Sequence, residues 1–183
     1  MNTNALTDNP GAAAGTKHDK ASECFPVVDP AGRIVGRATR GVCHGGSMLL
    51  HPVVHLHVFN SRGELYLQKR PAWKDIQPGR WDTAVGGHVE WGETVDAALR
   101  REAREELGLV GFAAEPVTVY CFESEREREL VHVFRTTCDG PIAPSGELDG
   151  GRFWTAAEIR AALGRGILTP NFEGEAGRLF GMQ

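Results

Sequence analysis

Hydrophobic and polar residues alternate in several short stretches of the chain, a pattern typical of β-strands. Residues 51–60 alternate Val54, Leu56 and Val58 with polar neighbours and continue through the turn SRG into ELYLQKR, which predicts a hairpin. The segments FPVVD and RIVGRAT, joined by PAG, predict an earlier hairpin. Three later segments are also predicted to be strands, namely PVTVYCF, LVHVFRT and RFWT.

Two segments have the periodicity of helices. In residues 95–107 an apolar residue recurs every fourth position, at Leu99, Ala103 and Leu107, and Gly108 follows as a helix end. In the second segment, AAEIRAALGRG, the preceding Thr155 and the third residue, Glu158, have the spacing of a capping box.

The stretch between the second hairpin and the first helix, residues 71–93, is rich in Gly, Pro and Trp and is predicted to be a long loop. Strands and helices are interleaved irregularly, which favours an α/β (α+β) protein with a mixed sheet. Residues 1–22 hold few large apolar side chains and predict a flexible tail, so residues 23–183 are expected to form a single domain.

Composition and charge narrow the class of protein. The net charge of −4 comes from 20 basic and 24 acidic residues spread along the chain, a balance that argues against nucleic acid as a partner. No apolar run is long enough to span a membrane and no secretory signal opens the chain, which predicts a cytoplasmic protein with no membrane partner. Cysteines without C-x-x-C spacing predict free thiols, at Cys24, Cys43, Cys121 and Cys138.

Carboxylates gather on one face of the first predicted helix. At about 100° per residue, Glu102, Glu105 and Glu106 fall within about one third of the helix circumference. Like charges four residues apart cost about 0.2–0.5 kcal/mol per pair, a repulsion that a bound cation would offset. A hard ion such as Mg²⁺ could bridge a diphosphate and lower the pKa of an attacking water, with a carboxylate as general base.

Nearby residues could support such a site. Arg101 lies four positions before Glu105 and could hold its side chain. Gly86 and Gly87 would let the backbone approach a ligand closely and offer carbonyl oxygens. Three basic residues lie where the second hairpin meets the loop, namely Lys69, Arg70 and Lys74. They either pair with phosphate or keep the end of the hairpin soluble, and phosphate pairing is favoured slightly.

Taken alone, REAREEL is more typical of a solvated, charged helix surface than of a metal site. The wider spacing, however, resembles the signature of the Nudix hydrolase family, G-x5-E-x7-R-E-U-x-E-E-x-G-U. The matching positions are Gly87, Glu93, Arg101, Glu102, Ala103, Glu105, Glu106, Gly108 and Leu109. The resemblance implies a Nudix fold, an α/β/α sandwich around a mixed sheet. It also implies that Glu102, Glu105 and Glu106 bind Mg²⁺ or Mn²⁺, that one carboxylate is the base, and that Glu93 supports the site.

Residues 27–134 further resemble the branch of this family related to type I isopentenyl-diphosphate isomerase. That resemblance implies a candidate second divalent metal site, at His44, His51, His88, Glu127 and Glu129. Each histidine alone is equally typical of a turn, strand or loop residue. The isomerase also needs a cysteine two residues before the motif histidine, where this chain has Gly86, which argues against isomerisation. Three histidines match nothing in the pattern and are expected to face solvent or polar partners: His55, His57 and His132.

The sequence therefore predicts a metal-dependent hydrolase that cleaves a diphosphate linkage in a nucleoside diphosphate derivative or a related small organic pyrophosphate. Two alternatives stay open, an isomerase that works without the usual cysteine and a non-catalytic nucleotide sensor. The rest of the substrate is unassigned, because several aromatic residues could stack on a base or pack against the sheet, namely Trp73, Trp81, Trp91 and Phe122. A homodimer is also an open alternative.

Overall fold

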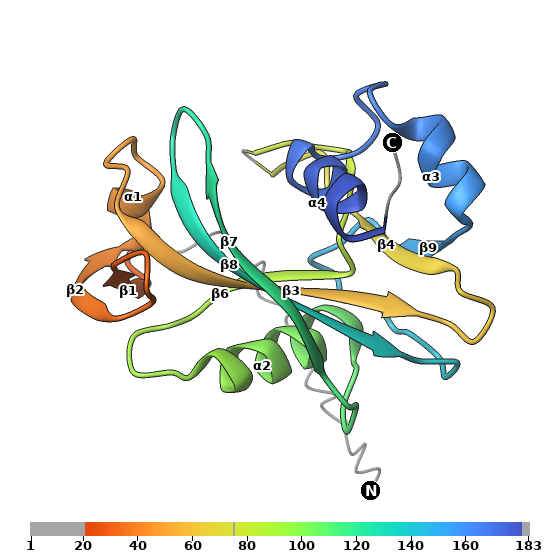
Figure 1. Ribbon diagram of the computed structural model, residues 1–183, viewed down its shortest axis with the longest axis horizontal. Coiled ribbons are helices and arrows are strands. Elements are labelled where there is room, and N and C mark those ends of the chain that lie inside the picture. Colours follow the sequence, from red (N-terminus) through yellow and green to blue (C-terminus); the bar gives the residue numbers. More distant parts are fainter. Residues whose placement is uncertain (1–20, 75, 181–183) are drawn as a thin grey trace, which may run out of the picture.

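A computed structural model describes residues 21–74 and 76–180, and its centre is a mixed β-sheet (Figure 1). Two long strands, β3 (Leu50–Phe59) and β8 (Arg128–Thr137), run parallel in the middle of the sheet. Antiparallel neighbours of β3 are β4 and β6, whereas β7 pairs with β8, and β5 and β9 pair with β4. Their bounds are β4 (Leu65–Lys69), β5 (Trp81–Asp82), β6 (Val85–His88), β7 (Glu115–Glu123) and β9 (Gly151–Trp154).

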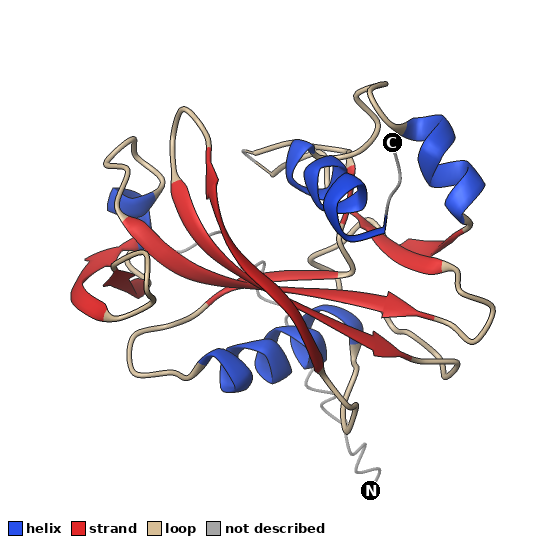
Figure 2. Ribbon diagram, in the orientation of Figure 1, coloured by secondary structure: helices blue, strands red, loops and turns tan. Residues whose placement is uncertain are grey.

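Helices cover both faces of this sheet. The helix α2 (Val95–Leu107) lies on one face, and α3 (Ala156–Ala162) and α4 (Pro170–Phe180) lie on the other (Figures 1 and 2). A separate two-stranded sheet, β1 (Cys24–Val28) with β2 (Ile34–Thr39), precedes the short helix α1 (Arg40–Cys43). Within the described residues no helix is long and apolar enough to cross a membrane.

The helix α2 forms where its sequence favours a helix and packs its apolar side on the sheet. Thr94 accepts a hydrogen bond from the Ala97 amide at the N-terminus, and Gly108 ends the helix with a φ of 65°. Leu99 and Ala103 are fully buried against Val54 and other residues of the sheet. The adjoining polar side of the helix carries Glu102 and Glu106, which meet the strand β6.

Most predicted elements are confirmed. Both hairpins, the strands β7, β8 and β9, the helix α2 and the capping box of Thr155 and Glu158 lie where the sequence placed them. The prediction of a loop over residues 71–93 was wrong for β5 and β6, whose pairing with distant strands leaves no periodic signal. The helices α1 and α4 were not predicted. Residues 1–20 of the expected tail lie outside the described residues.

The packing of α2 can be tested with one buried and one exposed residue. Leu99→Ala should lower the free energy of unfolding by about 2–5 kcal/mol, because a fully buried leucine would leave a cavity between α2 and the sheet. Val110→Ala, at a side chain that is 69% exposed, should change it by no more than about 0.5 kcal/mol. Urea unfolding measures both, and equal effects of the two changes would contradict this packing.

Candidate active site and metal centres

A cavity of about 900 Å³ opens along β6, between the polar side of α2 and the N-terminal end of α4. Its lining includes almost all residues singled out from the sequence as catalytic or metal-binding. The carboxylates of α2 lie at one part of the cavity, and His44, His88 and Glu127 lie at another. The strand β6 runs between these two groups, since it contributes Gly86, Gly87 and His88 in succession.

Arg101 organises the carboxylates of α2. Its guanidinium donates two hydrogen bonds to Glu93, at 3.0 and 2.9 Å, one to Glu102 at 2.7 Å and one to the carbonyl of His88 at 2.9 Å. The Glu105 carboxylate lies 3.6 Å from the same guanidinium. Burial acts to raise the pKa of Glu93, but the bonds from Arg101 outweigh it and lower the pKa below its usual value. The positively charged guanidinium of Arg101 thus holds the carboxylates of Glu93, Glu102 and Glu105 close to one another.

The glycines of β6 allow α2 to approach the strand. A Cβ atom on Gly87 would lie 2.1 Å from the carboxyl carbon of Glu102, so only glycine leaves room for that carboxylate. The Gly86 amide donates a 3.2 Å hydrogen bond to Glu106. Burial, followed by the neighbouring Glu102, raises the pKa of Glu106 well above its usual value. Crowded, partly buried carboxylates of this kind are an oxygen-rich environment that suits a divalent cation.

The structure also brings the three histidines of the second candidate site together. One ligand nitrogen from each of His44, His51 and His88 lies within 4.8 Å of the other two. His44 caps the end of α1, His51 lies on β3 and His88 ends β6. Phe25 of β1 stacks on His88, with ring centroids 4.5 Å apart. Three different elements of the fold therefore supply one cluster.

Two glutamates flank this cluster. Glu127 forms a close hydrogen bond with Nδ1 of His44, and this contact outweighs burial and lowers the pKa of Glu127. Glu129 is 8% exposed, and burial together with Glu127 raises its pKa to about 7. Burial also lowers the pKa of His51 and that of His88, which favours the neutral, metal-binding form of both rings.

The polar atoms of the cluster fit a metal ion. His51 donates a 3.0 Å hydrogen bond from Nδ1 to the Leu49 carbonyl, whereas its buried Nε2 has no hydrogen-bond partner among the described residues. A buried imidazole nitrogen without a hydrogen-bond partner needs an explanation. Together with two other histidines and two carboxylates it forms a set of ligands that suits metals such as Zn²⁺ or Mn²⁺.

The predicted basic residues differ in their placement. Arg70 and Lys74 line the cavity, whereas Lys69 is not part of its lining. Arg70 is held by Asp82 at 3.1 Å and by the carbonyl of Ile76. Phosphate binding by these side chains stays a prediction.

The four aromatic candidates also differ in whether they line the cavity. Phe122 lines the cavity, and Trp81 packs edge-on against Trp154, 5.1 Å between ring centroids. Trp73 and Trp91 are about half exposed, at 51% and 44%, with Lys74 and Arg37 over their respective rings. Of the four candidates, Phe122 is therefore the one whose position suits contact with the rest of the substrate.

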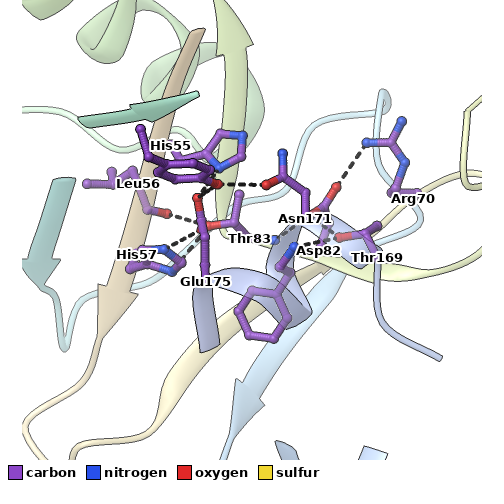
Figure 3. Close-up of polar contacts among 11 residues, drawn as sticks. His55, Leu56, His57, Arg70, Asp82, Thr83, Thr169, Asn171 and Glu175 are labelled. Carbon is purple, nitrogen blue, oxygen red and sulfur yellow. Dashed lines mark hydrogen bonds and ion pairs between the residues drawn. The ribbon is translucent and has the colours of Figure 1, made fainter. Parts of the chain in front are cut away.

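One group of polar residues was missed by the sequence analysis (Figure 3). His55 and His57 were expected to face solvent or polar partners. The second of these alternatives is confirmed, because His55 is 8% exposed, His57 is fully buried and both have a polar partner. Both rings contact Glu175 of α4 at 2.8 Å. Glu175 is separated from His55 by 120 positions, and no spacing pattern in the sequence connects them.

Comparison with known proteins agrees with this geometry. The NUDIX domain family model matches residues 49–172. An isopentenyl-diphosphate Delta-isomerase of Agromyces mediolanus is 34% identical over 113 residues, which cover 62% of this chain and 55% of that protein. An uncharacterized Nudix hydrolase of Nostoc is 39% identical over 87 residues, 48% of this chain and 52% of that protein. The chain thus spans about half the length of these two curated relatives.

Among solved structures, the crystal structure of DR0079 from Deinococcus radiodurans superposes with a TM-score of 0.74 and 25% identity, over 86% of this chain and 99% of that one. The chain belongs to the Nudix family. Its mixed sheet between helices is the Nudix fold, which confirms the predicted fold class.

Gly87→Ala tests the close approach of β6 to α2. The new methyl group would displace Glu102, so the affinity for Mg²⁺ should fall at least about 10-fold, the usual scale for disturbing the support of a metal site. Gly36→Ala is the matched control, because a Cβ there meets nothing within 4 Å. Calorimetric titration with Mg²⁺ compares the two. Unchanged affinity in Gly87→Ala would contradict the assignment of Glu102 as a ligand.

Proposed function

We propose that this protein hydrolyses a diphosphate linkage in a nucleoside diphosphate derivative or a related small organic pyrophosphate, with Mg²⁺ or Mn²⁺ as cofactor. The observation that carries the proposal is the carboxylate cluster of α2. Glu102 and Glu106 meet the glycines of β6, and Arg101 contacts Glu102 and Glu105. Such a set of carboxylates beside a large cavity is chemically suited to bind a cation together with phosphate oxygens.

The chain's own residues would divide the work at this site. Arg101 and Glu93 orient the cluster, because their paired hydrogen bonds leave the guanidinium no freedom to rotate. Glu105 is more exposed than Glu102, with side-chain exposures of 35% and 16%, and is the better placed of the two to meet a water molecule in the cavity. A divalent cation, when bound, supplies neutralisation of phosphate charge and a lower pKa for water.

The histidine cluster supports a second divalent ion in the same cavity. We propose His44, His51 and His88 as its ligands, with Glu127 and Glu129 adjacent, because the orphaned Nε2 of His51 otherwise has an unexplained desolvation cost. Such an ion would hold part of the substrate and would not by itself change the class of reaction.

Hydrolysis is preferred to isomerisation because of the residue at position 86. Isomerisation of an allylic diphosphate moves a proton on carbon, and Gly86 has no side chain to accept or donate one. The intact carboxylates disfavour a sensor, because a sensor has no need of Glu105 and Glu106 together. The relatives of this chain include proteins named as hydrolases and as isomerases, so hydrolysis and isomerisation must both be measured.

Glu105→Gln should nearly abolish metal-dependent hydrolysis, by at least about 100-fold in kcat, since it removes the charge that would bind the metal or activate the water. The fold should persist, because the side chain is partly exposed and the amide keeps its size. Glu115→Gln, on the exposed start of β7, is the control. Coupled phosphate release measures kcat, and an unimpaired Glu105→Gln variant would refute the mechanism.

Gly86→Cys separates hydrolysis from isomerisation. A Cβ at Gly86 would meet nothing closer than 3.7 Å, with His55 and Thr83 as its neighbours, so this position has room for a side chain. The protein with Gly86 should incorporate no solvent deuterium into isopentenyl diphosphate, and Gly86→Cys should acquire a trace of incorporation. Proton NMR in deuterated water follows the exchange. Efficient exchange by the protein that still has Gly86 would show that the isomerase alternative is correct.

A further inference from the structure

His55 lies in the wall of the cavity, where its side chain contacts the described residues through a hydrogen bond at Nδ1. It belongs to the central strand β3, lines the cavity and is 8% exposed. Its Nδ1 forms a 2.8 Å hydrogen bond with Oε1 of Glu175, a residue of α4 (Figure 3). Since Nδ1 faces α4, the orientation of the ring is set from a helix that packs over the sheet.

The other nitrogen, Nε2, lies beside Gly86. A Cβ built on Gly86 would be 3.7 Å from this atom, and the Gly86 amide donates to Glu106 at 3.2 Å. His55 and the carboxylate cluster are therefore separated by one glycine that has no side chain. A ligand with one phosphate at the carboxylates has room to place its neighbouring phosphate next to His55.

Glu175 favours a positive charge on this ring. The carboxylate is 1% exposed, and the hydrogen-bond partners that the structure gives it are two histidines and a tyrosine, at His55, His57 and Tyr120. A buried carboxylate without a nearby cation would be strongly unfavourable. A charged His55 is the compensating group, and it then donates from both ring nitrogens.

The surrounding charges agree with this protonation state. The carboxylates that favour a charged His55 are Glu175 on α4, Asp82 on β5 and Glu129 on β8, and the titratable His88 on β6 also interacts with this ring. Burial acts against the charged ring, but these carboxylates outweigh it and raise the pKa of His55 to about 9. Because the pKa is raised, the charged form is fully present below the ordinary histidine value and is lost as the pH rises through about 9.

We propose that His55 binds an anionic phosphate oxygen of the substrate through Nε2, beside the phosphate held at the carboxylates of α2, and that Glu175 is the positioning residue for this ring. The inference rests on the proposed function, because it concerns the diphosphate of the same site. His57 differs in that it is fully buried and is not part of the cavity lining. Its contact with Glu175 serves to fasten α4 to the sheet.

The test uses binding, so that it does not depend on turnover. Methylenediphosphonate, a diphosphate analogue that cannot be hydrolysed, is titrated calorimetrically into the full chain saturated with Mg²⁺. His55→Asn should bind it about 10- to 100-fold more weakly, the scale of a lost charge-assisted hydrogen bond. His132→Asn, a partly buried histidine on β8 whose burial lowers its pKa, is the control and should bind normally.

Glu175→Gln provides a readout that a purely structural role would not move. The glutamine amide has the size of the Glu175 carboxylate but lacks its negative charge. His55 should therefore lose its proton between about pH 6 and pH 8 rather than near pH 9. The ratio of wild-type to Glu175→Gln affinity should therefore rise across this interval, and the ratio cancels the titration of the ligand itself. A constant ratio would overturn the assignment of Glu175.

Two further outcomes keep the inference falsifiable. If Glu175→Gln does not fold, NMR of ¹⁵N-labelled histidine in the unaltered protein replaces it. The spectrum should show His55 as imidazolium, and the diphosphonate should shift the Nε2 resonance. A neutral ring, or one that does not respond to the diphosphonate, refutes the inference. Normal binding by His55→Asn refutes it too, while hydrolysis by the wild type leaves the proposed function standing. Conversely, loss of binding in His55→Asn together with a wild type that hydrolyses nothing supports the subsite and refutes hydrolysis.

Discussion

The close approach of α2 to the backbone of β6 is the constraint on which the rest of the site depends. Glu102 occupies the space that a side chain at position 87 would need, and Arg101 ties the same helix to the carbonyl of His88. The apolar side of α2 is buried against the sheet, so its acidic side cannot turn away from the strand. Packing on one side of the helix thus keeps the carboxylates crowded on the other.

The short strand β6 connects the two chemical halves of the cavity. Successive residues of a strand point to opposite faces, so Gly87 meets Glu102 on the side of α2, whereas Gly86 faces His55 and His88 joins the histidine cluster. The carboxylates and the histidines therefore keep a fixed relation to one another. A substrate diphosphate lying along β6 would contact both groups at once.

Helical periodicity made much of the carboxylate cluster predictable. The spacing of Leu99, Ala103 and Leu107 defined the buried side of α2, and the acidic residues followed on the remaining side. The contact of Arg101 with Glu105, four positions apart, was predictable for the same reason. The three histidines of the second cluster were grouped by family resemblance alone, because α1, β3 and β6 meet only in the folded chain.

Non-local contacts account for what was missed. Nine of the ten positions of β3 are buried, because helices cover both faces of the sheet, so alternation could not show which side His55 and His57 face. The helix α4 contains Gly174 and Gly177, residues that disfavour helices, and it forms through burial of Phe172 and Ala176. Its Glu175 meets β3 only after the whole domain has folded.

The most direct measurement is ³¹P NMR of purified protein with Mg²⁺ or Mn²⁺ in ¹⁸O-labelled water, with nucleoside triphosphates, nucleotide sugars, dinucleotides and isopentenyl diphosphate as substrates. The account predicts cleavage of a diphosphate linkage in at least one of them, with ¹⁸O from water in one of the two phosphate products. Metal-dependent binding of one compound without any cleavage across the panel would contradict the account and identify the protein as a sensor.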